Sequence, residues 1–234
     1  MEIQTISTGS KGNCYILSHE HRRIIFDAGV TMTEIKKAID YDVNSVDMAF
    51  ITHAHRDHAR SLKKLLDMGV LVVMPPSLYE QYKDKYINAV KLEPENIYNL
   101  NGVLVTALPV PHDTTECYGY IITWKGQKIA YLTDLEYCPF DLSQLEITTA
   151  IVECNYDEEY VNLDIPQIKH KLLGHMGVKT CSQFISTLNK ETLKNVFLCH
   201  MGEGMCDYDT LIQKIKKVTQ ANVYVCVPKL LAEI

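Results

Sequence analysis

The residues best suited to chemistry lie in one short stretch, FITHAHRDHAR, residues 50–60. It places His53, His55, Asp57 and His58 directly after an apolar run. In an extended segment residues i and i+2 share a face, so His53 and His55 can point the same way. A turn after Asp57 then lets Asp57 and His58 approach from another side. Imidazole and carboxylate groups bind divalent metals at about 2.0–2.2 Å. The stretch therefore predicts ligands for two neighbouring metal ions.

Three other apolar runs end in a residue of the same kind. LPVPHD contains His112, AYLTD ends in Asp134 and VFLCH ends in His200. Strand ends are where α/β folds collect their functional residues. This series after the HxHxDH motif extends the predicted metal site to three further segments of the chain.

The elements that must position these residues are short strands followed by helices. Runs rich in β-forming residues predict strands over 2–7, 14–18, 23–28, 47–52, 69–74, 102–110, 118–123, 128–134, 149–154, 195–200 and 221–226. Helical spacing of apolar residues predicts helices over 31–39, 58–68, 75–86, 178–189 and 207–220. The order of strands and helices repeats roughly in two halves, with no linker between them. We therefore expect a single α/β domain over residues 1–234, with helices outside stacked sheets.

Composition limits the compartment and the partners. Formal net charge is −6, so the chain as a whole does not attract a polyanion at long range. No apolar run reaches the roughly 18 residues of a membrane span, and the N-terminus carries no secretion signal. Eight cysteines without a CxxC pair favour a reducing compartment and argue against a thiolate zinc site. We expect a cytoplasmic protein with no membrane partner.

The ordered set of HAHRDH, His112, Asp134 and His200 resembles the metallo-β-lactamase fold superfamily over essentially the whole chain. The resemblance implies an αββα four-layer sandwich with the site at one edge of the sheets. It also implies ligands for two divalent ions. One ion would be held by His53, His55 and His112, and the other by Asp57, His58 and His200. Asp134 would bridge the two ions. Zinc is the expected metal, with manganese or iron as alternatives.

Three further segments narrow the resemblance to one branch. STGSKGNCYIL (7–17), LLGHMG (172–177) and LCHMGEG (198–204) are similar to the phosphodiesterase branch that holds RNase Z, WalJ-type DNA exonucleases and phage anti-Pycsar cyclic-nucleotide phosphodiesterases. His175 matches the non-ligand histidine of that branch, which contacts the scissile phosphate. Only 21 residues separate His112 from Asp134, which leaves no room for the tRNA-binding arm of RNase Z.

The resemblance implies a binuclear-metal phosphodiesterase in which Asp57 orients the attacking water and His175 assists the leaving oxygen. Together with the acidic charge, it favours cyclic mononucleotides (cUMP, cCMP, cAMP or cGMP) as substrates, with a role in evading Pycsar immunity in the host cytoplasm if the protein is phage-encoded. Tyr156 or Tyr160 is a candidate for stacking on the base. Three alternatives stay open: a DNA or RNA nuclease, a thioester or lactone hydrolase, and a non-enzymatic metal-binding protein. The expected assembly is a homodimer.

Overall fold

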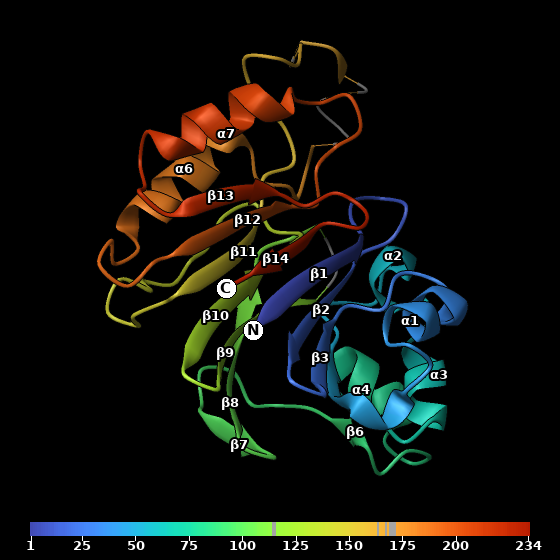
Figure 1. Cartoon of the computed structure of the whole chain (residues 1–234). Helices are drawn as coiled ribbons and strands as arrows, with labels where there is room; N and C mark the ends of the chain where they lie inside the picture. The colour runs from blue at the N-terminus through green and yellow to red at the C-terminus, as the bar shows by residue number, and fades with distance from the viewer. Residues whose placement is uncertain (114–115, 163, 167, 169–171) are drawn as a thin grey trace.

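Two β-sheets packed face to face form the centre of the molecule (Figure 1). The computed structural model describes residues 1–113, 116–162, 164–166, 168 and 172–234. Within these residues each sheet has seven strands, in the orders β14-β1-β2-β3-β4-β5-β6 and β13-β12-β11-β10-β9-β8-β7.

The first sheet holds the N-terminal strands and the last strand of the chain. Its strands are β1 (Glu2–Ser7), β2 (Cys14–His19), β3 (Arg22–Phe26), β4 (Val46–Phe50), β5 (Leu71–Val73), β6 (Ala89–Val90) and β14 (Leu231–Glu233). Pairing is antiparallel from β14 to β3 and parallel from β3 to β6. The carboxyl ends of β3, β4 and β5 therefore lie at one edge.

The second sheet repeats this change from antiparallel to parallel pairing. Its strands are β7 (Tyr98–Leu100), β8 (Val103–Val110), β9 (Cys117–Trp124), β10 (Gln127–Leu132), β11 (Thr149–Glu153), β12 (Asn195–Cys199) and β13 (Asn222–Val225). Pairing is antiparallel from β7 to β10 and parallel from β10 to β13. The ends of β10, β11 and β12 therefore meet at one edge as well.

Helices cover the outer face of each sheet (Figure 1). The helices beside the first sheet are α1 (Met32–Ala38), α2 (Arg56–Ala59), α3 (Leu62–Asp67) and α4 (Pro76–Tyr82), with a 3₁₀ turn η1 (Val43–Ser45) before β4. The second sheet carries α6 (Val178–Thr187) and α7 (Tyr208–Lys216). None of the described helices combines the length and the apolar character needed to cross a bilayer.

The buried side chains form three layers of core that match this arrangement. Aromatic rings fill the space between the two sheets, where Phe26 lies 4.8 Å from Tyr131 and Phe50 lies 5.1 Å from Tyr120 between ring centroids. A further apolar cluster lies between each sheet and the helices that cover it. Burial on both faces explains why the central strands read as nearly continuous apolar runs. The predicted αββα four-layer sandwich is confirmed.

The predicted helix over 58–68 is wrong in its continuity, because the chain forms α2 and α3 with a break at Ser61. The Ser61 amide donates to the Ala28 carbonyl at 2.8 Å, and its hydroxyl donates to the Val30 carbonyl at 2.6 Å. These long-range bonds take the amide out of the helical ladder and tie the helices to the end of β3. The short strands β6, β7 and β14 also escaped prediction, since two or three residues carry no periodic signal.

Candidate metal centre and active site

The candidate site lies at the edge where the strands of both sheets end. Asp134 follows β10 and His200 follows β12, and both have left-handed backbones with φ of 51°. Asp27, directly after β3, has φ of 54°. Such backbones are uncommon for residues other than glycine and concentrate at functional sites. In each case the sharp turn at the strand end brings a titratable side chain toward the space between the sheets.

The first trio of predicted ligands is brought together by the structure. His53, His55 and His112 each offer one ring nitrogen, and these atoms lie within 4.8 Å of one another. His112 donates from Nδ1 to the Gly174 carbonyl at 2.9 Å. His53 Nδ1 lies 3.0 Å from the Thr52 hydroxyl. Both contacts use Nδ1 and leave Nε2 to face the cluster.

The second trio is assembled in the same way. Asp57, His58 and His200 offer ligand atoms within 4.8 Å of one another. Asp57 Oδ2 lies 3.7 Å from His58 Nε2 and 3.9 Å from His200 Nε2. Asp57 is only half-buried, so its carboxylate can also reach a molecule that enters the site.

Asp134 lies between the two trios, where a bridging ligand would have to lie. Its Oδ2 atom is 3.2 Å from His58 Nε2 and 3.7 Å from Nε2 of both His53 and His112. Its Oδ1 atom is 3.2 Å from His200 Nδ1. Ligands bound tetrahedrally at about 2.1 Å stand about 3.4 Å apart, so these separations suit donors around shared ions.

Unpartnered nitrogens provide the test of whether a metal fits. The Nε2 atoms of His53, His112 and His200 are buried and have no hydrogen-bond partner among the described residues. Buried polar atoms without partners are rare because they cost free energy. Nitrogen and oxygen donors in this number suit zinc, manganese or iron. The residues therefore fit divalent ions, which Nε2 of His53, His112 and His200 and the carboxylates of Asp57 and Asp134 would help to hold.

Asp27 orients one histidine of the cluster and was not predicted. Its buried carboxylate accepts from His58 Nδ1 at 2.7 Å, from the Tyr131 hydroxyl at 2.6 Å and from the Thr52 amide at 2.9 Å. A carboxylate behind an imidazole fixes its tautomer and makes it a better ligand. The signal was in RIIFDA, where an aspartate ends an apolar strand as Asp134 does in AYLTD.

Glu153 has the same role for two other histidines and was also not predicted. It is fully buried at the end of β11, and its Oε1 atom accepts from His175 Nδ1 at 2.7 Å and from His200 Nδ1 at 3.0 Å. Its Oε2 atom accepts from the Leu135 amide at 2.8 Å. Glu153 therefore aims Nε2 of His200 at the cluster and holds His175 beside it without making His175 part of either trio.

Burial and the neighbouring His58 hold the pKa of His53 well below its usual range, whereas carboxylates raise the pKa of His200 and His58. Burial would lower the pKa of His200, but the charge of Asp134, the nearby Asp57 carboxylate and the hydrogen bond to Glu153 raise it to about 10. Burial also opposes protonation of His58, yet Asp134 and Asp27 hold its pKa well above the usual range. The site therefore favours positive charge at the positions where metal ions would lie.

Ser10 contributes to the lining of two of the cavities that open beside the cluster. The first, about 530 Å³, is here called the methionine pocket; its lining includes Met201, Met205 and Leu172 along with His175 and His200. The second, about 260 Å³, is here called the basic pocket and is lined by Ser10, Lys11, Gly29, Arg56, Asp57 and Arg60.

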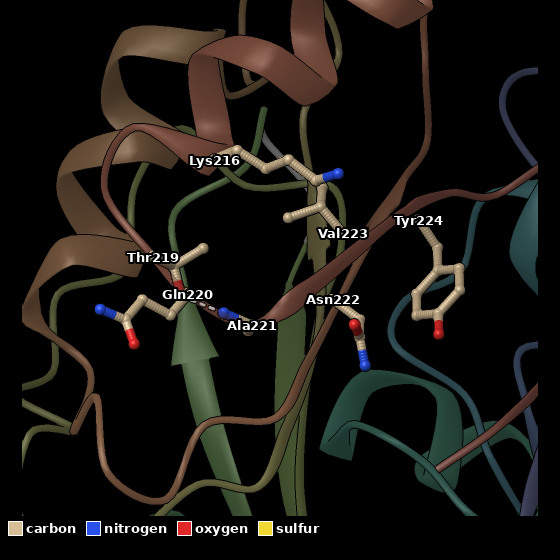
Figure 2. Close-up of a pocket in the computed structure, with 7 residues that line it drawn as sticks. All are labelled: Lys216, Thr219, Gln220, Ala221, Asn222, Val223 and Tyr224. Carbon is tan, nitrogen blue, oxygen red and sulfur yellow. Dashed lines mark hydrogen bonds between the residues drawn. The ribbon is translucent and has the colours of Figure 1, made fainter.

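The tyrosines predicted to stack on a base line neither pocket. Tyr156 packs against Gly177, with which it forms a β-bridge. Tyr160 is 58% exposed. A third cavity, about 410 Å³, lies at β13 and the end of α7 (Figure 2). Its lining includes Lys216 and Tyr224 but no carboxylate, imidazole or thiol, so it offers no comparable chemistry.

Comparison with known proteins identifies the family of the chain. The model of the "Beta-lactamase superfamily domain" matches residues 22–201. Exodeoxyribonuclease YycJ of Bacillus anthracis is 22% identical over 217 residues, covering 86% of this chain and 82% of that protein. Exodeoxyribonuclease WalJ of Streptococcus pneumoniae is 21% identical over 236 residues, covering 93% and 86%.

Among solved structures, the metallo-β-lactamase fold protein YhfI from Bacillus subtilis superposes with a TM-score of 0.78 at 17% identity, covering 100% of this chain and 99% of that one. The fold likeness therefore extends over the whole chain, and the family match extends from β3 to the residue after His200. With the donor set described above, the chain is a metal-dependent hydrolase of the metallo-β-lactamase fold and belongs to the beta-lactamase superfamily.

Proposed function

We propose that the protein hydrolyses a phosphodiester bond of a nucleotide substrate. The observation that carries this proposal is the position of His175, which Glu153 holds by Nδ1 at 2.7 Å while its ring lines the methionine pocket beside the cluster. A hydrolase of thioesters or lactones has no need of this additional imidazole. The names of the two exodeoxyribonuclease relatives support the same reaction class.

The chemistry divides between bound ions and the side chains around them. When bound, divalent ions would supply a nucleophile at neutral pH and neutralise charge on the phosphoryl oxygens. Asp57 accepts a hydrogen bond from the attacking water and fixes its direction. His175, whose Nδ1 is engaged by Glu153, donates from Nε2 to the phosphate or to the leaving oxygen. Burial opposes a charge on this ring, but the hydrogen bond to Glu153 raises the pKa of His175 above its usual value, which favours the charged ring that carries a second proton on Nε2.

The methionine pocket is the site proposed for the base next to the scissile bond. Met201, Met205 and Leu172 supply polarizable apolar surface for a flat ring. The Asn155 amide donates to the His200 carbonyl at 2.7 Å, so it holds the wall of the pocket in place. Ser10 and Glu203 at the lining offer hydrogen-bonding groups for the edge of a base.

Two kinds of substrate fit this reaction. The first candidate is a cyclic mononucleotide, and its hydrolysis would serve to evade Pycsar immunity. This substrate remains a prediction from the sequence, and the net charge of −6 favours it over a long polyanion. The end of a DNA or RNA strand is the second candidate, and both exodeoxyribonuclease relatives favour it. Zinc is the proposed metal, with manganese or iron as alternatives, and a homodimer is the proposed assembly.

A substrate panel tests the proposal on the full chain loaded with zinc or manganese. The panel contains cUMP, cCMP, cAMP and cGMP, labelled single- and double-stranded oligonucleotides, bis(p-nitrophenyl) phosphate, a thioester and a lactone. We expect hydrolysis of diesters only, and its loss in His53→Ala and Asp57→Ala. Turnover of the thioester or lactone without any diester would contradict the proposal, as would full diester activity in both variants.

A further inference from the structure

The basic pocket gathers three cationic side chains directly beside the metal centre of an acidic chain. Lys11, Arg56 and Arg60 line it, and so does Asp57, a member of the second trio. Arg56 and Arg60 lie one helical turn apart, since the Arg60 amide donates to the Arg56 carbonyl at 3.0 Å. Residues spaced by four share one face of a helix. This spacing explains why both arginines line the same cavity.

The backbone around the pocket is fixed by close packing. The Asn13 amide donates to the Asp57 carbonyl at 2.7 Å, and the Gly29 amide donates to the Asn13 carbonyl at 2.9 Å. A Cβ atom on Gly29 would lie 1.6 Å from the Asp57 carbonyl oxygen, so only glycine permits this approach. The turn over residues 8–13, the end of β3 and α2 thus form one closely packed wall, and this fixes the backbone positions from which the cationic side chains extend beside Asp57.

The acidic groups near the basic pocket do not neutralise its cations by strong ion pairs. Among the residues that the structure describes, neither Arg56 nor Arg60 forms an ion pair, not even with the adjacent Asp57. Lys11 pairs with Glu203 at 3.0 Å, but both side chains are more than three-quarters exposed. An exposed pair of this kind is weak because water and salt screen it.

Glu34 is a further acidic group close enough to feel the charge of Arg60. Its Oε2 atom accepts from the Thr31 amide at 2.8 Å in the capping box that begins α1. The Glu34 carboxylate is therefore occupied at the helix start. The positive charge of the pocket has no assigned use within the described fold.

We propose that the basic pocket binds a second phosphate group of the substrate, one that is covalently joined to the scissile phosphodiester and is not cleaved. The proposal rests on the phosphodiesterase function proposed above. Arginine forks match phosphate oxygens in bidentate geometry, and Lys11 adds a point charge. The substrate then places a base in the methionine pocket and a phosphate in the basic pocket, both of which include Ser10 in their lining. A cyclic mononucleotide carries a single phosphate and leaves the basic pocket unused.

The test uses the full-length, metal-loaded protein and substrates that share one scissile diester. TpT has no second phosphate, pTpT and TpTp have a terminal phosphate at opposite ends, and TpTpT has a second internal diester. We expect at least one of the last three to exceed TpT in kcat/KM by about 10-fold, the effect of one charge-assisted hydrogen bond. A preference confined to pTpT or TpTp identifies a terminal phosphate as the occupant, and a preference for TpTpT identifies an internal one.

Two variants connect the preference to the pocket. Arg60→Gln should abolish the preference over TpT, while Lys64→Gln, which removes one exposed charge on α3, should retain it. Equal kcat/KM for all four substrates would overturn the inference, and so would a preference that survives in Arg60→Gln. Hydrolysis of bis(p-nitrophenyl) phosphate in the same samples shows whether the proposed function still stands.

A binding measurement decides the matter independently of turnover. Analogues of TpT, pTpT, TpTp and TpTpT with an uncharged methylphosphonate in place of one diester resist hydrolysis there and keep only the second phosphate; TpTpT is tested with the replacement at each linkage in turn. Calorimetry should give at least one of the phosphate-bearing analogues a Kd about 10-fold below that of the TpT analogue. The difference should disappear in Arg60→Gln and persist in Lys64→Gln. Equal Kd values for all of the analogues would overturn the inference even if diester hydrolysis is confirmed.

Discussion

Glu153 Oε1 and His175 Nδ1 lie 2.7 Å apart, although the two residues are separated by 22 positions in the chain. The same oxygen accepts from His200 Nδ1 at 3.0 Å. One buried carboxylate therefore orients a predicted metal ligand and the predicted catalytic histidine together. Because it contacts both imidazoles and does not itself line either pocket, Glu153 is a positioning residue.

Substitution of this carboxylate by the neutral amide, Glu153→Gln, should lower kcat about 10- to 100-fold, the usual effect of losing a partner behind a ligand. The amide leaves both imidazoles without their shared charged acceptor, so both rings are held less firmly. Steady-state kinetics on bis(p-nitrophenyl) phosphate should show the loss in kcat more than in KM, with weaker metal binding by elemental analysis. Glu191→Gln, an exposed change of equal charge, serves as control. A variant with unaltered kcat and metal content would refute the positioning role.

His175→Ala separates assistance of the leaving group from binding. General acid catalysis is worth about 10²- to 10⁴-fold and matters most for a poor leaving group. The variant should lose far more kcat/KM on a nucleotide diester than on bis(p-nitrophenyl) phosphate, whose leaving group departs without a proton. The exposed His21→Ala is the control. Equal losses on the two substrates would show that His175 binds phosphate without donating to the leaving oxygen.

Removal of metal should destabilise the protein as well as inactivate it. Asp27, Asp134 and Glu153 are buried close together, and bound cations offset their mutual repulsion. Saturation at 1,000 times Kd stabilises the native state by about 4 kcal/mol, which corresponds to a fall in Tm of about 8–16 °C on chelation. Thermal unfolding with and without chelator measures this change, and zinc or manganese should restore both Tm and activity. A chelated protein with unchanged Tm and activity would argue against the metal centre.

The double variant His53→Ala/His58→Ala provides the matched control for chelation. It removes one nitrogen from each trio and should abolish the dependence of Tm on added metal. A metal-dependent Tm that persists in this variant would place the bound ions elsewhere in the molecule.

The ligand set could be predicted from sequence because each ligand follows an apolar strand, and the motif HAHRDH supplies four of them within six residues. Asp27 gave the same strand-end signal in RIIFDA, but a lone aspartate there is equally compatible with a turn. Glu153 was hidden because TAIVE continues into an acidic loop, and only the pairing of β11 with β10 and β12 places it behind two histidines.

The basic pocket depends still more on tertiary structure. Lys11 and Arg60 are 49 positions apart and are joined only by the contact between the turn over residues 8–13 and α2. Tyr156 was attractive as a stacking residue because of its place after a strand, but its ring packs against Gly177. Side-chain direction in such loops follows from partners that local sequence does not specify.

Gly29→Ala should disturb both stability and catalysis, because its Cβ would lie 1.6 Å from the carbonyl oxygen of Asp57. Relief of this overlap requires movement of backbone and should cost about 1–3 kcal/mol of unfolding free energy. The movement displaces Asp57, so kcat on bis(p-nitrophenyl) phosphate should fall as well. Gly69→Ala is the control: it meets no atom within 4 Å but has φ of +80°, so it should lose about 1 kcal/mol and keep its kcat. Urea unfolding and steady-state kinetics on the two variants check the prediction. An active Gly29→Ala protein of normal stability would show that the contact between Gly29 and Asp57 is not rigid.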